Sequence, residues 1–287
     1  MKKFFAQTYL WFLLLLLYAP LLFIGIFSFT ESKVLGNWTG FSTGLYQNLF
    51  SSNINGGASL LAAIQNTIVI ALVAAAISTI MGTIAAIGIF NLKGRKRDTM
   101  LFLNNIPIIN PDIITGVSLF LLFIFLHFSQ GYVTVTLAHI TFCIPYVVLS
   151  VMPKLAQMNP NIYEAALDLG ASPSIALKRV LLPQLKPGMI SGFILAFTMS
   201  LDDFAVTFFT RGTIGLETLS TYIYADARKG GLTPELRPLM TMIFTAVLIL
   251  LIIIHVRQSK SIKRCFSHRQ IPFNLFSNNH LQLLIIK

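Results

Sequence analysis

Long apolar stretches separated by short polar segments run along most of the chain. A helix needs roughly 20 apolar residues to cross a hydrocarbon core about 30 Å thick. By this measure the pattern predicts six membrane-spanning helices and thus an all-α membrane protein, with a six-span transmembrane domain over residues 1–256 and a basic tail over 257–287. The expected spans are residues 9–29, 67–90, 112–128, 133–152, 187–209 and 239–256.

Two of the apolar stretches can be interpreted in more than one way. The first follows Lys2 and Lys3, as the apolar part of a signal peptide would. It is too long for that role and no small-residue cleavage site follows it, so we interpret it as an uncleaved span. The stretch 99–128 is too long for one straight crossing and contains Pro107 and Pro111. We therefore expect an interfacial segment before the third span.

Composition narrows the class of protein. Hydrophobic residues make up 55% of the chain and charged residues 11%, against roughly 25% charged residues in a typical soluble domain. The mean hydropathy is +0.75. These values exclude an ordinary soluble enzyme and a disordered chain, because disorder requires few apolar residues and many charges. The two cysteines, Cys143 and Cys265, indicate neither a disulfide framework nor a metal site.

The charges indicate an orientation. The net charge is +11, from 21 Lys and Arg against 10 Asp and Glu. With six spans, most basic residues fall on one side: at the N-terminus, in the connection around Lys93, in the segment 153–186 and in the tail. The positive-inside rule then predicts that both termini are cytoplasmic. The net charge is thus an orientation signal and not evidence of nucleic-acid binding.

The predicted cytoplasmic segment 153–186 contains two sets of helix signals. In the first, Asn159 is a good N-cap, Pro160 suits the first helical position and Gly170 suits the end of the helix. In the second, Ser172 and Pro173 begin a helix that is expected to run through Val180 and to stop at Pro183. Both helices are too short to be stable alone, so we expect them to dock on another surface.

The same segment carries a spaced pattern: Glu164-Ala165-Ala166, Gly170, Val180 and Leu182-Pro183. It resembles the EAA loop of the permeases of binding-protein-dependent ABC importers, with Val180 where Ile is more usual. The resemblance implies the fold of a type I (MetI-like) importer permease. It also implies that the loop is a coupling helix seated in a groove of a separate cytoplasmic ATPase. The residues implied for ATPase coupling are Glu164, Ala165, Ala166, Gly170, Leu182 and Pro183.

Three carboxylates fall within or beside the predicted spans: Asp112, Asp202 and Asp203. A charge near the bilayer centre costs at least ~2.5–3.5 kcal/mol, so such residues usually face the bundle interior or a water-filled path. Asp202 and Asp203, taken as neighbours about 100° apart on one helix, cannot both face a path. One is expected to face it and the other to cap or pair with a neighbouring span. A purely structural role for all three stays open.

Carboxylates on a transport path suit a cationic substrate, and aromatic faces such as Phe204 and Tyr222 could add cation–π contacts. The sequence around Ser200-Leu201-Asp202-Asp203-Phe204 is similar to the PotC-type permeases of spermidine/putrescine importers. This resemblance implies a polyamine substrate and a bacterial inner membrane location. The implied partners are a second, PotB-like permease, two copies of a PotA-like ATPase and a PotD-like periplasmic binding protein.

The chain has no phosphate-binding loop of the G-x-x-x-x-G-K-[ST] type. We therefore expect no enzyme activity and no cofactor in this chain, with ATP and magnesium on the partner ATPase. His127 and His139 are isolated and are interpreted as packed or interfacial residues. Three alternatives stay open: an ABC importer of another small solute, a non-transporting membrane scaffold or sensor, and an ion-coupled secondary transporter.

Overall fold

The computed structural model describes residues 2–32, 36–50, 57–159, 161–213, 216–229, 233–234, 236–245 and 248–249. The described residues are helical, with connecting turns, and divide into two compact units. One unit comprises residues 1–54 and 232–287, and the other comprises residues 55–231. Half of the sixth predicted span, 239–256, and the whole tail, 257–287, lie outside the described residues.

The first unit contains α1 (Lys2–Phe27), α2 (Gly44–Phe50) and a helical segment over residues 236–245. Its aromatic contacts gather just beyond α1, where the ring of Phe29 lies 5.4 Å from that of Phe41 and 5.2 Å from that of Tyr46. The guanidinium of Arg237 is buried and donates a hydrogen bond of 2.8 Å to the carbonyl of Ser32. This contact ties the last helical segment to the loop after α1.

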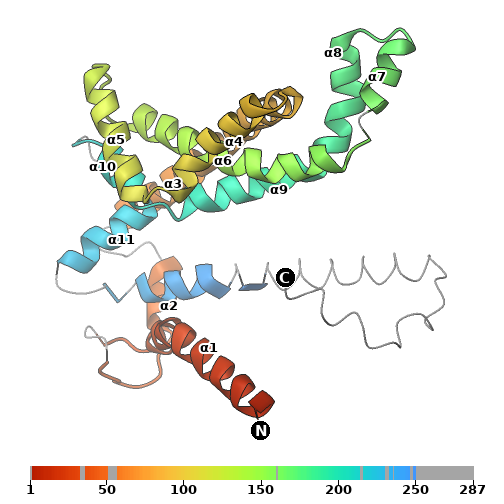
Figure 1. The fold of residues 1–287 in the computed structure, drawn as a ribbon. Coiled ribbons are helices and arrows are strands. Elements are labelled where there is room, and N and C mark those ends of the chain that lie inside the picture. The colour runs from red at the N-terminus through yellow and green to blue at the C-terminus, as the bar shows by residue number, and fades with distance from the viewer. Residues whose placement is uncertain are drawn as a thin grey trace. The chain divides into compact units, whose positions relative to one another are not determined.

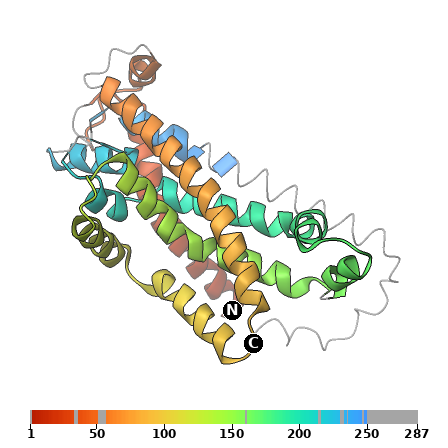
Figure 2. The ribbon, with the colours of Figure 1, turned by 90° about the horizontal axis from the view of Figure 1, so that it is seen from above.

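The second unit is built on three long helices that lie side by side: α3 (Gly57–Asn91), α6 (Tyr132–Gln157) and α9 (Leu182–Leu201) (Figures 1 and 2). Small residues allow the close approach that helices need in lipid, where no hydrophobic effect drives them together. Gly82 on α3 and Gly192 on α9 both face Val147 on α6. The buried core of this unit includes Ala75, Ala86, Val147, Val151, Leu155, Leu185 and Ala196.

Four helices of the described residues are long and apolar enough to cross a membrane. They are Gln7–Phe27, Ser59–Asn91, Tyr132–Gln157 and Pro173–Leu201. The helices α4 (Arg95–Ile109) and α5 (Asp112–Phe125) pass the same test only as a pair, bent by 104° at the break between them. Pro111 explains the break, because it lacks an N–H and disfavours helical backbone at the residue before it.

The structure corrects the third predicted span. The helix expected over 112–128 ends at Phe125, and His127 adopts a positive φ of 56° in the turn that follows. At 1.5 Å per residue, the 14 residues of α5 extend only about 21 Å. This length is short of a full crossing.

The expected stop at Pro183 is also wrong. α8 (Pro173–Ala176) continues through a π-helix (Leu177–Leu181) directly into α9. In the π turn the N–H of Leu182 donates to the carbonyl of Leu177, five residues back. Proline cannot donate to the carbonyl four residues back and its ring clashes with that carbonyl. The wider π turn next to Pro183 relieves this conflict, so the helix passes through the proline without ending.

Candidate functional site

The short helix α7 (Asn161–Asp168) is closed at both ends by its own residues. At its start, the side-chain oxygen of Asn159 accepts a hydrogen bond of 3.0 Å from the N–H of Asn161. At its end, Gly170 adopts a φ of +86°, which a residue with a side chain rarely adopts. The N–H groups of Gly170 and Ala171 donate to the carbonyls of Leu167 and Ala166, which forms a Schellman motif.

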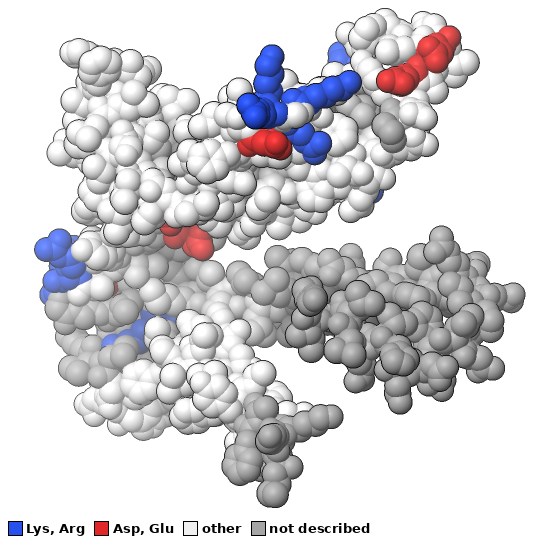
Figure 3. Space-filling model, in the orientation of Figure 1, with Lys and Arg blue, Asp and Glu red and all other residues white. Residues whose placement is uncertain are grey.

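Some side chains of α7 are exposed on its outer surface, and others line a pocket beneath the helix. Glu164 and Ala165 are exposed, and Leu169, in the turn after the helix, is 89% exposed. Figure 3 shows acidic side chains over α7 and a group of basic ones over the start of α4. Of the predicted coupling residues outside α7, Leu182 is half-buried and Pro183 is exposed at the start of α9. The structure therefore brings Glu164, Ala165, Ala166 and Gly170 together, with Leu182 and Pro183 on a different helix.

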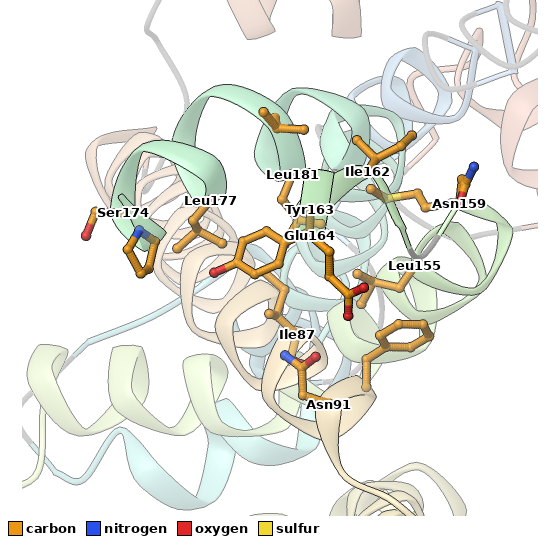
Figure 4. Close-up of a pocket in the computed structure, with 14 residues that line it drawn as sticks. Ile87, Asn91, Leu155, Asn159, Ile162, Tyr163, Glu164, Ser174, Leu177 and Leu181 are labelled. Carbon is orange, nitrogen blue, oxygen red and sulfur yellow. The ribbon is translucent and has the colours of Figure 1, made fainter. Parts of the chain in front are cut away.

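A pocket of about 500 Å³ lies between α7, α8 and the ends of α3 and α6. Figure 4 shows the ring of Tyr163 and the side chain of Glu164 on its α7 side, with Ile87 and Asn91 of α3 opposite them. Leu177 and Leu181 complete an apolar wall. The pocket leaves α7 without a continuous layer of side chains beneath it.

The second group of predicted residues lies where α9 ends. The span expected over 187–209 is not one helix: α9 ends at Leu201, and α10 (Ala205–Thr210) begins after a break at Asp202–Phe204. The two aspartates are therefore not helical neighbours, which corrects the expected geometry. The reason is that Asp203 caps α10 with its side chain, in place of continuing α9.

The Asp203 carboxylate is held by three donors on α10. One oxygen accepts the N–H of Val206 at 3.2 Å, and the other accepts the N–H and the hydroxyl of Thr207 at 2.8 and 2.9 Å. Its side chain is only 6% exposed, whereas Asp202 is exposed. The hydroxyl of Ser220 donates to the Asp203 carbonyl at 2.5 Å, which ties α11 (Leu219–Arg228) to the break.

Asp112 belongs to the same region through the packing of α5 on α10. It is the exposed first residue of α5. One turn later, Gly116 faces the backbone of Ala205 and Val206, where a Cβ would lie 3.1 Å from the Ala205 carbonyl oxygen. Because α5 packs on α10, Asp112 lies on a helix that neighbours the break. The three aspartates predicted from sequence thus lie in one region of the fold.

Aromatic rings cover the break on the α11 side. The ring of Phe204 lies 4.6 Å from that of Tyr224 and 5.4 Å from that of Phe208. The guanidinium groups of Arg211 and Arg228 lie 5.4 and 5.9 Å from the rings of Phe208 and Tyr224. The predicted Phe204 is therefore part of an aromatic cluster.

Tyr222, the other predicted aromatic residue, does not take part in these ring contacts within the described structure. Burial raises the pKa of its phenol, and the nearby charges of Asp226 and Glu217 raise it further. Tyr222 therefore keeps its proton at neutral pH. Tyr224, two residues further along α11, is the tyrosine whose ring joins the aromatic cluster.

His139 is the residue of this site that sequence reasoning missed. The sequence indicates a packed histidine, and the side chain is indeed only 1% exposed on α6, but its ring also contacts the break. Its Nδ1 lies 2.6 Å from the hydroxyl of Ser200, and its Nε2 lies 2.9 Å from the hydroxyl of Thr207 and 3.4 Å from the Asp203 carboxylate. The available signal was an ionisable residue inside an apolar span, which calls for a named partner.

Comparisons with known proteins agree with this architecture. A family model for the inner membrane component of binding-protein-dependent transport systems matches residues 78–260. The chain is 38% identical over 239 residues to the putrescine transport system permease protein PotI of Escherichia coli K12, covering 80% of this chain and 82% of that protein. It is 34% identical over 254 residues to the spermidine/putrescine transport system permease protein PotC of Haemophilus influenzae, covering 88% and 96%.

The fold is also found among solved structures. A chain of a bacterial ABC transporter involved in the import of the acidic polysaccharide alginate superimposes with a TM-score of 0.65 at 14% identity, covering 90% of this chain and 95% of that one. A second structure, of an alginate ABC transporter in complex with a pentasaccharide-bound periplasmic protein, gives a TM-score of 0.62 at 19% identity. At these identities the likeness concerns the fold alone.

Proposed function

Because the chain belongs to the family of inner membrane components of binding-protein-dependent transport systems, we propose that it is a permease subunit of an ATP-driven importer of polyamines. The observation that carries the proposal is the exposed carboxylate of Asp202 at the α9–α10 break, with Asp112 at the start of α5, which packs on α10, and with the aromatic cluster around Phe204 beside the break. Relatives named for putrescine and spermidine/putrescine transport support the same substrate.

Polyamines suit such a site for chemical reasons. They carry two or more ammonium groups joined by apolar stems. A carboxylate exposed at a helix break can pair with an ammonium group, and an aromatic face can contact the charge or the stem. Irregular backbone at membrane depth is tolerated where it lines a cavity. Asp202, exposed at the break, is the carboxylate that we assign to the substrate.

The energy source is proposed to be a separate ATPase, in which ATP and magnesium bind. Its contact with this chain would be α7 and the turn at Gly170, where Glu164, Ala165 and Leu169 are exposed. Small side chains allow a partner helix or groove to approach closely, and Glu164 offers a carboxylate to a basic residue. The pocket beneath α7 gives the helix room to move when the ATPase closes.

The assembly that follows contains this chain, a second PotB-like permease, two copies of a PotA-like ATPase and a PotD-like periplasmic binding protein. We propose six spans with both termini in the cytoplasm of a bacterial inner membrane, from the distribution of basic residues. A single subunit with this many spans needs a second one to enclose a path.

The test is substrate-stimulated transport by the whole complex. The chain is purified with the permease, ATPase and binding protein encoded beside it and reconstituted in proteoliposomes. Labelled putrescine and spermidine should enter in an ATP-dependent manner, whereas amino acids, sugars and ferric ion should not. Asp202→Asn should raise the KM of polyamine uptake on the order of tenfold, the equivalent of about 1.4 kcal/mol of lost pairing.

Two results would count against the proposal. Uptake of only the other solutes would assign the chain to an importer of a different substrate. Uptake that continues without ATP, or no uptake at all by an intact complex, would favour an ion-coupled transporter or a non-transporting scaffold. Asp202→Glu, which keeps the charge, serves as the matched variant for Asp202→Asn.

A further inference from the structure

Helix α6 contacts the α9–α10 segment through a row of polar side chains. The hydroxyl of Thr134 donates to the carbonyl of Thr210, the last residue of α10, at 2.9 Å. The thiol of Cys143 donates to the carbonyl of Ala196 on α9 at 3.4 Å. His139 lies between them along α6 and faces the break itself. Helix α6 therefore contacts α9, the break and the end of α10 at three points along its length.

Hydrogen bonds link the ring of His139 to both helix ends. Its Nδ1 is bonded to the hydroxyl of Ser200 and its Nε2 to the hydroxyl of Thr207. The hydroxyl of Thr207 in turn donates to the carboxylate of Asp203, so it accepts from the Nε2–H. The chain of bonds connects the last turn of α9 to the first turn of α10.

This arrangement gives the two aspartates different roles. Asp203 already accepts two backbone N–H groups and the Thr207 hydroxyl, and its side chain is 6% exposed. It is thus occupied within the chain. Asp202, the preceding residue, ends α9 with a φ of −98° and a ψ of 0° and is exposed. Asp202 thus directly precedes the residue that is held in the α10 cap.

We propose that His139 is a positioning residue for the cation site: by holding Thr207 and Asp203 it fixes the α9–α10 break so that Asp202 faces the substrate. The inference rests on the proposed function and deepens it, because it separates the binding carboxylate from the structural one. Removing the ring leaves the Ser200 hydroxyl without this buried partner and the Thr207 hydroxyl with Asp203 alone, and buried polar groups without a partner are costly. The break then shifts, and Asp202 shifts with it.

The experiment compares variants of the whole reconstituted complex by the KM and kcat of ATP-driven polyamine uptake and by the thermal unfolding of the complex. His139→Leu should raise the KM on the order of tenfold, the scale expected for losing one hydrogen bond to a charged network, with kcat changed by less. His139→Gln, whose amide can occupy the place of Nε2–H, should recover most of the KM. Thr207→Val, which removes only the connecting hydroxyl, should change the KM in the same direction by a smaller factor.

Thr141→Val is the matched control on α6. Its hydroxyl donates to the carbonyl of Leu137 in the same helix and is exposed, so its KM should equal that of the wild type. If His139→Leu fails to assemble, His139→Gln and Thr207→Val decide the question. Wild-type KM values in both, or a fall in kcat with an unchanged KM, would overturn the positioning role.

Asp203→Asn separates the two aspartates. We expect it to lower the thermal unfolding temperature, because it weakens the cap of α10, and to be non-additive with His139→Gln, since both act in one network. An Asp203→Asn complex with unchanged thermal unfolding and a raised KM would make Asp203 the binding carboxylate and overturn the assignment.

A failure of the proposed function gives a different result from a failure of the positioning role. If the wild-type complex transports no polyamine, the substrate assignment is wrong, whereas the thermal coupling between His139 and Asp203 is measured without any substrate. If polyamine uptake is normal and the His139 variants leave its KM unchanged, only the positioning role is wrong.

Discussion

The α9–α10 break and the α7–α8 hairpin are both short irregular regions, and they are stabilised in opposite ways. At the break, side chains from α6 and α11 reach across to hold Asp203, Thr207 and Thr210. In the hairpin, α7 is closed by its own Asn159 and Gly170, and its outer surface is exposed. The first region is completed within this chain, whereas the second leaves a surface open for another subunit.

This difference predicts how substitutions will act. A change at the break or in the helices that support it should lower the free energy of unfolding, because buried contacts are lost. A change in the hairpin should leave folding almost intact and reduce transport.

The contact between α3 and α6 gives the largest expected effect. A Cβ at Gly82 would lie 2.7 Å from Cβ and Cγ1 of Val147 and 3.2 Å from the carbonyl of Ile144. Gly82→Ala should therefore lower the free energy of unfolding by about 2 kcal/mol, measured by detergent-induced unfolding of the purified protein. Gly88→Ala is the control, since a Cβ at Gly88 meets nothing within 4 Å. Equal effects at both positions would rule out the steric explanation.

The hydrogen bond that holds the far end of α10 gives a smaller effect. Thr134→Val keeps the shape of the side chain but leaves the carbonyl of Thr210 and the N–H of Gly131 without their partner. The expected loss in the free energy of unfolding is about 1 kcal/mol. Thr136→Val is the control, because its exposed hydroxyl bonds only within its own helix. If the two variants unfold alike, the cross-helix bond contributes nothing measurable.

The contrast between local and long-range contacts also explains which features could be predicted from the sequence. The cap at Asn159 and the positive φ at Gly170 depend on a few consecutive residues, and the structure confirms both. The bend at Pro111 has an equally local cause. All three could be predicted because the residue type and its neighbours determine the backbone.

The break at Asp202–Phe204 could not be predicted in this way. No Gly or Pro lies at the break itself, and the residues that hold it include a histidine on another helix, 64 positions earlier than Asp203 in the chain. At Pro183 the sequence predicts the end of a helix, but a π turn lets the helix continue past this proline. From charge alone, the sequence assigns the aspartates to one transport path. Only the structure shows that Asp203 is buried whereas Asp202 is exposed.

The turn after α7 should give the smallest effect on folding together with a large effect on transport. Gly170 has a φ of +86°, and a Cβ there meets nothing within 4 Å. Asp tolerates left-handed backbone better than most residues, so Gly170→Asp should lower the free energy of unfolding by about 1 kcal/mol or less. If the turn docks on the ATPase, the added carboxylate should nevertheless abolish most ATP-driven uptake, while the amount of protein in the membrane stays unchanged.

Gly40→Asp is the matched control, because Gly40 also has a positive φ, of +121°, and open space around it, but lies between α1 and α2. It makes the same chemical change at a site that we do not assign to the ATPase, so uptake should be retained. Uptake that survives in Gly170→Asp would contradict the coupling role of the hairpin. Loss of uptake in both variants, with equal loss of stability, would attribute the Gly170 effect to folding and remove the distinction between the two regions.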